Sequence, residues 1–204
     1  MRRFHGFKDT GQAFPIYITV VGGLLLLAFA YLAVGQAAAN RNGAQTAADA
    51  AALAAAQDTR KQLAAQWLQD VRDPTKWQAI FDGDAPVNPS CWRAYELAAQ
   101  NEAHVESCAP TGLLGYTVEV KTDRPVGDSV IPGTENQYAT ASATAVIESL
   151  CTFDLPDGDV KEGEEKGAVL PSLKCKDKTW ELIPGNLTDL PEPRDLFDVH
   201  LADD

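Results

Sequence analysis

The side chains that could carry chemistry in this 204-residue chain are few and widely separated. The three histidines, His5, His104 and His200, lie far apart in sequence, so no metal site built from them is expected. Acidic residues crowd between Asp154 and Glu164, and carboxylates are ligands that calcium accepts, but their spacing does not fit an EF-hand loop. A solvated acidic loop is the favoured interpretation. Neither a nucleophile elbow nor a phosphate-binding glycine loop occurs, so the sequence predicts a protein that is not an enzyme and needs no cofactor.

The four cysteines are disulfide candidates: Cys91, Cys108, Cys151 and Cys175. None belongs to a Cys-x-x-Cys pair, which disfavours a zinc ribbon or a redox motif, and an even number is typical of an oxidising compartment. Four cysteines allow three connectivities. A bridge between Cys91 and Cys108 would close a loop of about 17 residues and contribute roughly 3 kcal/mol. Cys151 and Cys175 flank the acidic loop, which a bridge between them would staple.

An apolar run near the start of the chain is expected to hold the rest of the protein at a membrane. No charged residue occurs between Asp9 and Arg41, and residues 13–35 are mostly apolar. As a helix this run would reach roughly 34 Å, enough to cross a hydrocarbon core of about 30 Å. The run is longer than the apolar core of a signal peptide, which favours an uncleaved anchor, although small residues at 35–38 resemble a cleavage site.

Charge gives the expected orientation of this anchor and excludes one class of partner. Arg2, Arg3 and Lys8 precede the apolar run, which predicts a cytoplasmic segment over 1–12 and an extracytoplasmic remainder in a single-pass cell-membrane protein. The whole chain carries a net charge of −12. A surface of this sign is repelled by nucleic acid, so nucleic acid is not an expected partner.

Alanine dominates the segment that follows the apolar run. Residues 36–72 contain no proline and only one glycine, Gly43. Because alanine is the strongest helix former, this composition predicts a slim helical stalk that continues the membrane span. A stripe recurs along it every four residues and consists of Arg41, Gln45, Asp49 and Leu53. The stripe either sets the register between neighbouring helices or faces water, and we name its members as assembly-interface candidates.

After the stalk the pattern changes to short elements and loops. A short helix is expected over 91–104, and alternating patterns predict strands over 115–122 and 138–148. Alanines line one face of the second strand, and we expect this face to pack against the long helix near residues 63–71.

These elements predict the domain organisation and the fold class. We expect an α+β head over 73–183 and an acidic, mobile tail over 184–204. The fold class is therefore α+β: a long N-terminal membrane-spanning helix continues as a stalk and leads into a small, disulfide-stapled extracytoplasmic head, a pilin-like architecture.

The N-terminal region resembles a known family. Asp9-x-Gly11-Gln12-Ala13, one membrane span, and the block AQTAADAAALA at residues 44–54 are similar to the TadE/TadG-like proteins of tight-adherence (Flp) pilus assembly. The resemblance covers about residues 9–60. It implies a pseudopilin-like structural component of pilus assembly or secretion at the bacterial surface, acting through helix–helix and protein–protein contacts. The expected partners are other pilin-like or pilus-assembly membrane proteins, membrane lipid, and a second copy through the stalk.

An alternative function belongs to a different class. The chain would then be a single-pass anchored extracytoplasmic binding or sensor module, with the helix as a spacer. A pocket lined by tryptophans would favour this alternative, whereas copurification with a secretion ATPase and its membrane platform would favour pilus assembly.

Overall fold

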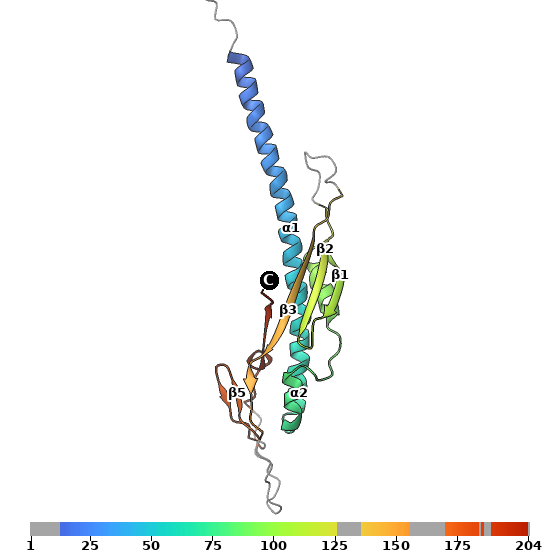
Figure 1. Ribbon diagram of the computed structural model, residues 1–204, viewed down its shortest axis with the longest axis vertical. Coiled ribbons are helices and arrows are strands. Elements are labelled where there is room, and N and C mark those ends of the chain that lie inside the picture. Colours follow the sequence, from blue (N-terminus) through green and yellow to red (C-terminus); the bar gives the residue numbers. More distant parts are fainter. Residues whose placement is uncertain (1–12, 126–135, 156–169, 184, 186–188, 204) are drawn as a thin grey trace, which may run out of the picture.

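One long helix organises the computed structural model, which describes residues 13–125, 136–155, 170–183, 185 and 189–203. Helix α1 (Ala13–Gln69) runs unbroken for 57 residues, or about 85 Å, and carries the head at its C-terminal end (Figure 1). The expected cytoplasmic segment over 1–12, with its basic residues and His5, lies outside the described residues. So does most of the acidic loop between Asp154 and Glu164.

The head contains helices beside α1 and two antiparallel sheets. The short helical elements are η1 (Pro74–Lys76), α2 (Trp77–Phe81), α3 (Cys91–Gln100) and α4 (Pro193–Leu196). The larger sheet has the order β1-β2-β3-β7 and is built from β1 (Ala103–Pro110), β2 (Gly115–Thr122), β3 (Thr140–Ser149) and β7 (Phe197–Leu201). The smaller sheet contains β4 (Cys151–Thr152), β5 (Leu173–Cys175) and β6 (Thr179–Trp180). The expected fold class is therefore confirmed.

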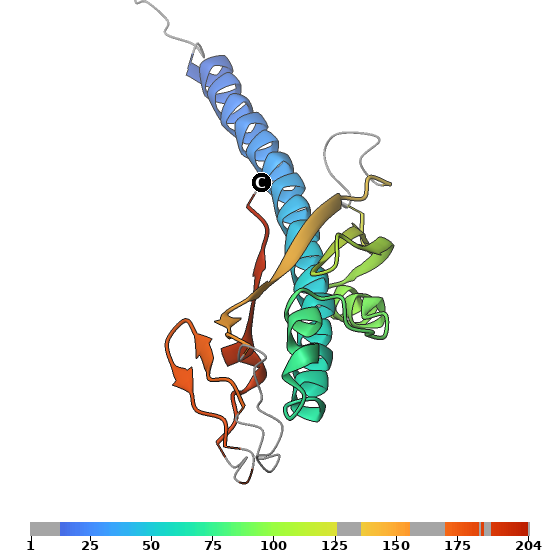
Figure 2. The ribbon, with the colours of Figure 1, turned by 60° about the horizontal axis from the view of Figure 1, so that its bottom comes forward.

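The alanine-rich part of α1 forms the centre of the head's core. Its fully buried alanines are Ala44, Ala47, Ala48, Ala51, Ala52, Ala55 and Ala56. Figure 2 shows α3 on one side of this segment and the long strand β3 crossing it on another. Small side chains are needed here because they let both neighbours approach the helix backbone closely. Most of the predicted stalk therefore lies inside the head.

The sheet meets α1 nearer the membrane than residues 63–71, where the sequence pattern predicted the contact. The side-chain amide of Gln45 lies 3.4 Å from the carbonyl oxygen of Ser142 on β3. One further contact is buried: the Thr59 hydroxyl donates to the phenol oxygen of Tyr116 on β2 at 3.2 Å. At the far end of α1, Trp67 instead packs against Trp77 of α2, with ring centroids 5.5 Å apart. The alanine face of β3 does pack inward, since Ala143 and Ala145 are buried.

The C-terminal stretch is not the mobile tail that its acidic, proline-containing sequence predicts. Residues 193–201 form α4 and β7, and β7 pairs with β3 in antiparallel register from Ser149↔Phe197 to Ala145↔Leu201. Leu196 and Phe197 are fully buried in the core. Burial of two large apolar side chains, together with a strand ladder, holds the segment in place despite its charge.

Candidate assembly surface

The first half of α1 exposes large apolar side chains on every side. Leu26 is 71% exposed and Tyr31 is 83% exposed, and the exposed apolar residues run from Phe14 to Val34. This part of α1 is long and apolar enough to cross a membrane. A bilayer would cover these side chains, so this segment is suited to the membrane anchor that the sequence predicts.

Between the anchor and the head lies a short exposed stretch of α1, residues 36–43, which we call the neck. Seven of its eight residues are exposed, and only Asn40 is half-buried. At 1.5 Å per residue the neck is about 12 Å long. It is built from small residues and the single charge of Arg41, the only charged residue between Asp9 and Asp49.

The predicted stripe is divided between the neck and the head. Arg41 is exposed in the neck, whereas Asp49 is half-buried and Leu53 packs against the core. Gln45 donates one hydrogen bond to the Asp49 carboxylate at 2.8 Å and one to the Ser142 carbonyl. Gln45 therefore contacts β3, Leu53 packs partly against the core, and Arg41 has no ion-pair partner among the described residues.

The Gln45 contact has a structural reason. Carbonyls two residues apart on a strand point to the same side, so the Ser142 carbonyl follows the Thr144 carbonyl along one edge of β3. The Thr144 carbonyl accepts a hydrogen bond from the backbone N–H of Ala202 at 2.8 Å, just beyond the end of β7. Gln45 supplies the next donor along this edge, which β7 is too short to reach.

A second strip of α1 stays open within the head, and we call it the open face. Its residues recur at helical spacing and are Thr46, Ala50, Leu53, Gln57 and Lys61. Thr46, Gln57 and Lys61 are exposed, and Ala50 and Leu53 are half-buried. The sequence analysis missed this strip, although longer polar side chains interrupting an alanine run were a usable signal. The neck and the open face together form one continuous surface along α1.

The cysteines pair as Cys91–Cys108 and Cys151–Cys175. The first bridge ties the start of α3 to β1, and the second joins β4 to β5 across a directly paired position. Both pairings were among the connectivities that the sequence left open, and they staple the head.

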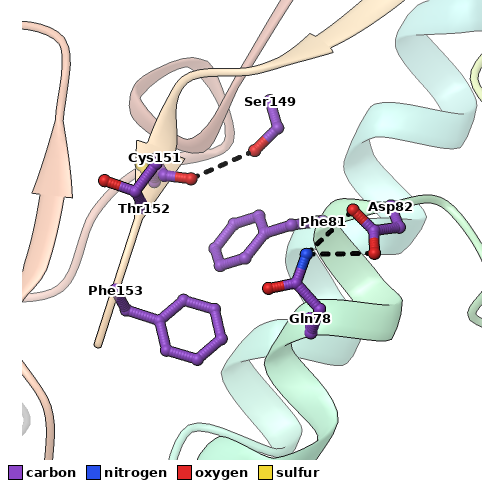
Figure 3. A pocket seen from close by; sticks show the side chains of 7 residues that line it. All are labelled: Gln78, Phe81, Asp82, Ser149, Cys151, Thr152 and Phe153. Carbon is purple, nitrogen blue, oxygen red and sulfur yellow. Dashed lines mark hydrogen bonds between the residues drawn. The ribbon is translucent and has the colours of Figure 1, made fainter. Parts of the chain in front are cut away.

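One cleft of the described head lies between α2 and β4 and has a volume of about 340 Å³ (Figure 3). Phe81 and Phe153 form its apolar wall, with ring centroids 6.0 Å apart. On the α2 side, next to Phe81, Gln78 donates to both carboxylate oxygens of Asp82, at 2.9 and 3.0 Å. A pocket lined by tryptophans would have favoured the binding-module alternative. No tryptophan lines this cleft, although Trp180 lines a smaller one of about 90 Å³.

Histidines lie among carboxylates at two places on the sheet. The Nδ1 atom of His104 is 2.8 Å from Asp123, and its Nε2 atom is 3.0 Å from Glu106, so the carboxylates flank opposite sides of the ring. The hydrogen bond to Asp123, supported by Glu106, raises the pKa of His104 above its usual value.

On β3 and β7 the exposed side chains of Glu148, Asp198 and His200 bring their ligand atoms within 4.8 Å of one another. This cluster depends on the strand register, which the sequence analysis could not read. Exposed groups of these types are common on solvated surfaces, and we assign this cluster no role.

Comparison with known proteins identifies the N-terminal region. Residues 11–58 match the family described as "Putative Flp pilus-assembly TadE/G-like". No curated protein and no solved structure matches the chain. The resemblance seen in the sequence is therefore confirmed for the anchor, the neck and the turns of α1 that the head surrounds. This family is structural rather than catalytic, and the match connects the chain broadly with Flp/Tad pilus assembly.

Proposed function

We propose that this chain is a pseudopilin-like structural component of Flp/Tad-type pilus assembly or secretion at the bacterial surface. The observation that carries the proposal is the family match over residues 11–58, which falls on the membrane anchor, on the neck and on the open face as far as Gln57. The chain acts through protein–protein contacts, with other pilus-assembly membrane proteins as its partners.

The proposed topology places the N-terminus in the cytoplasm and the head outside. Arg2, Arg3 and Lys8 before the anchor support this orientation. Two disulfides in the head also support it, because such bonds persist in oxidising compartments.

The proposed contact surface begins at the neck. Its small side chains allow a neighbouring helix to approach within the 8–10 Å typical of packed helices. Arg41 is the one charge available there, so an acidic residue of the neighbour is its expected partner. From the neck a partner helix, including that of a second copy, can continue along Thr46 and Gln57 on the open face.

The alternative, an anchored binding module, is favoured by one observation, the cleft between α2 and β4. The short neck argues against a spacer role for the helix. Only about 12 Å of α1 separates the anchor from the head, so the helix does not lift the head far from the membrane.

Site-specific photo-crosslinking in the source bacterium tests the proposal. A photo-reactive amino acid replaces Asn42 in the neck, and the control position is Glu96, which is exposed on α3. We expect Asn42 to crosslink to a pilin-like membrane protein or to a second copy, and Glu96 to give neither product. Recovery of monomer alone from both positions, at equal membrane insertion, would contradict an assembly role for the neck.

A further inference from the structure

We propose that the cleft at the junction of neck and head binds the headgroup of a zwitterionic phospholipid of the phosphatidylethanolamine class. The proposal rests on the membrane-anchor part of the proposed function and does not depend on pilus partners. Three observations carry it: the distance of the cleft from the apolar run along α1, the charges in its walls, and an unpartnered amide beside it.

The distance of the cleft from the bilayer follows from the continuity of α1. The apolar run ends near Gly35, and the cleft is lined on the α1 side by Ala39, Asn40 and Gly43. Because α1 is one unbroken helix, these residues lie about 6–12 Å beyond the apolar run. The headgroup layer of a bilayer is roughly 5–7 Å thick on each side. The cleft therefore opens at the outer boundary of that layer, and Figure 1 shows the ends of β2 and β3 extending along α1 toward the anchor.

The opposite wall of the cleft carries both signs of charge. The cleft has a volume of about 250 Å³, and this wall consists of Asn101, Glu102, Thr122, Arg124 and Pro125. The Arg124 guanidinium lies 3.1 Å from the Glu102 carboxylate, and both side chains are largely exposed, at 78% and 63%. An exposed ion pair contributes little to stability, so its members are free to exchange partners. Arg124 suits a lipid phosphate, and Glu102 suits the ammonium group of the same headgroup.

Asn40 provides an independent indication. Its side-chain nitrogen is buried and has no hydrogen-bond acceptor within the described part of the chain. Leaving a buried donor unpaired costs free energy, and because this nitrogen has no surface open to solvent, a shift of the cleft wall on binding would let a phosphate oxygen supply the missing acceptor. Asn40 is also the half-buried residue of an otherwise exposed neck, so its amide faces this junction.

The head contains a matched ion pair that lies away from the bilayer. Arg194 and Glu192 are 2.8 Å apart and are exposed at 74% and 63%, values close to those of Arg124 and Glu102. Arg194 lines the small cleft beside Trp180. It belongs to α4, which lies beside β5 at the end of the head remote from the anchor (Figures 1 and 2). Free phosphate reaches both clefts, but the headgroup of a bilayer lipid reaches only the one at the neck.

Native mass spectrometry of the full chain tests the proposal. The protein is released from detergent micelles containing equal amounts of phosphatidylethanolamine, phosphatidylglycerol and phosphatidylcholine, and the retained lipid is counted. We expect phosphatidylethanolamine to be retained preferentially. Arg124→Ala should reduce this retention about tenfold or more, the scale of one lost charge-assisted hydrogen bond, whereas Arg194→Ala should leave it unchanged.

Two further variants and one competitor sharpen the result. Asn40→Leu should also reduce retention, and Arg124→Lys should retain part of it, because the positive charge remains. Equal retention by the wild type and Arg124→Ala would overturn the proposal, as would equal losses in Arg124→Ala and Arg194→Ala. A preference for phosphatidylglycerol, or displacement of the lipid by inorganic phosphate, would also overturn it by showing a simple anion site. Retention of no lipid at all would likewise overturn the proposal, and it would leave the membrane anchor untouched, because a single membrane-spanning helix need not retain lipid.

Discussion

Leucine in place of Ala51 should destabilise the head, whereas the same change at Ala65 should not. Ala51 is fully buried in the core, and Ala65 is exposed on the same helix. The extra carbons at Ala51 have no space, and overpacking of this kind costs about 1–3 kcal/mol. At Ala65 the expected change lies within about 0.5 kcal/mol. The small difference in helix propensity between alanine and leucine is the same at both positions and cancels.

The assay is thermal unfolding of the full chain in detergent, followed by near-UV circular dichroism. Trp67 and Trp77 pack against each other in the core and report loss of tertiary structure. For a protein of this size each kcal/mol shifts Tm by roughly 2–4 °C, so Ala51→Leu should lower Tm by about 2–12 °C. Equal Tm values for the Ala51 and Ala65 variants would refute the reasoning. The alanines would then serve contacts with neighbouring chains, and Ala51→Leu would lower crosslinking from Asn42 instead.

Three other perturbations test the head. Phe197→Ala should cost about 3–5 kcal/mol in urea unfolding because its ring is fully buried 5.6 Å from that of Phe81, and unchanged stability would restore the mobile-tail interpretation. Removing the Cys91–Cys108 bridge by double alanine substitution should cost roughly 3 kcal/mol, measured under non-reducing conditions. No loss of stability would show that loop closure by this bridge does not stabilise the head. The folded-state pKa of His104 is raised, so its stabilising contribution is present below the ordinary pKa of 6.5 and is lost as pH rises through the folded-state pKa. The Tm difference between wild type and His104→Ala should therefore be larger near about pH 6 than near about pH 8, and a difference independent of pH would contradict it.

The sequence was sufficient for the long helix because that helix depends on local properties. Residues 16–69 contain no proline, the apolar run has the length of a membrane span, and alanine has a strong helix propensity. The sequence does not show which elements pack against this helix. An alanine such as Ala51 suits a neighbour in another chain as well as a strand of the same chain, and only the tertiary structure distinguishes the two. For this reason the sequence left open whether the stripe containing Gln45 sets the register between helices or faces water, and it gave no sign that the Gln45 amide reaches β3.

The C-terminal segment shows the limit of composition as a guide. Charge and proline content predicted disorder from residue 184 onward, yet pairing between residues about fifty apart in sequence incorporates Phe197–Leu201 into the sheet. Long-range strand pairing has no local signature, and the register that places His200 near Glu148 has none either. The cysteine pairs were easier to anticipate, because each closes a short loop around a recognisable element.

The continuity of α1 from the membrane into the core has a mechanical consequence. A head joined by a flexible linker would respond to a pull on its anchor by extending the linker. Here a force applied along the anchor passes through a rigid helix of 57 residues directly to the buried alanines and their contacts with β3. The load falls in shear on a whole helix–sheet interface, so many contacts resist it together. We therefore expect a pull on the anchor strong enough to displace α1 to unfold the head as well.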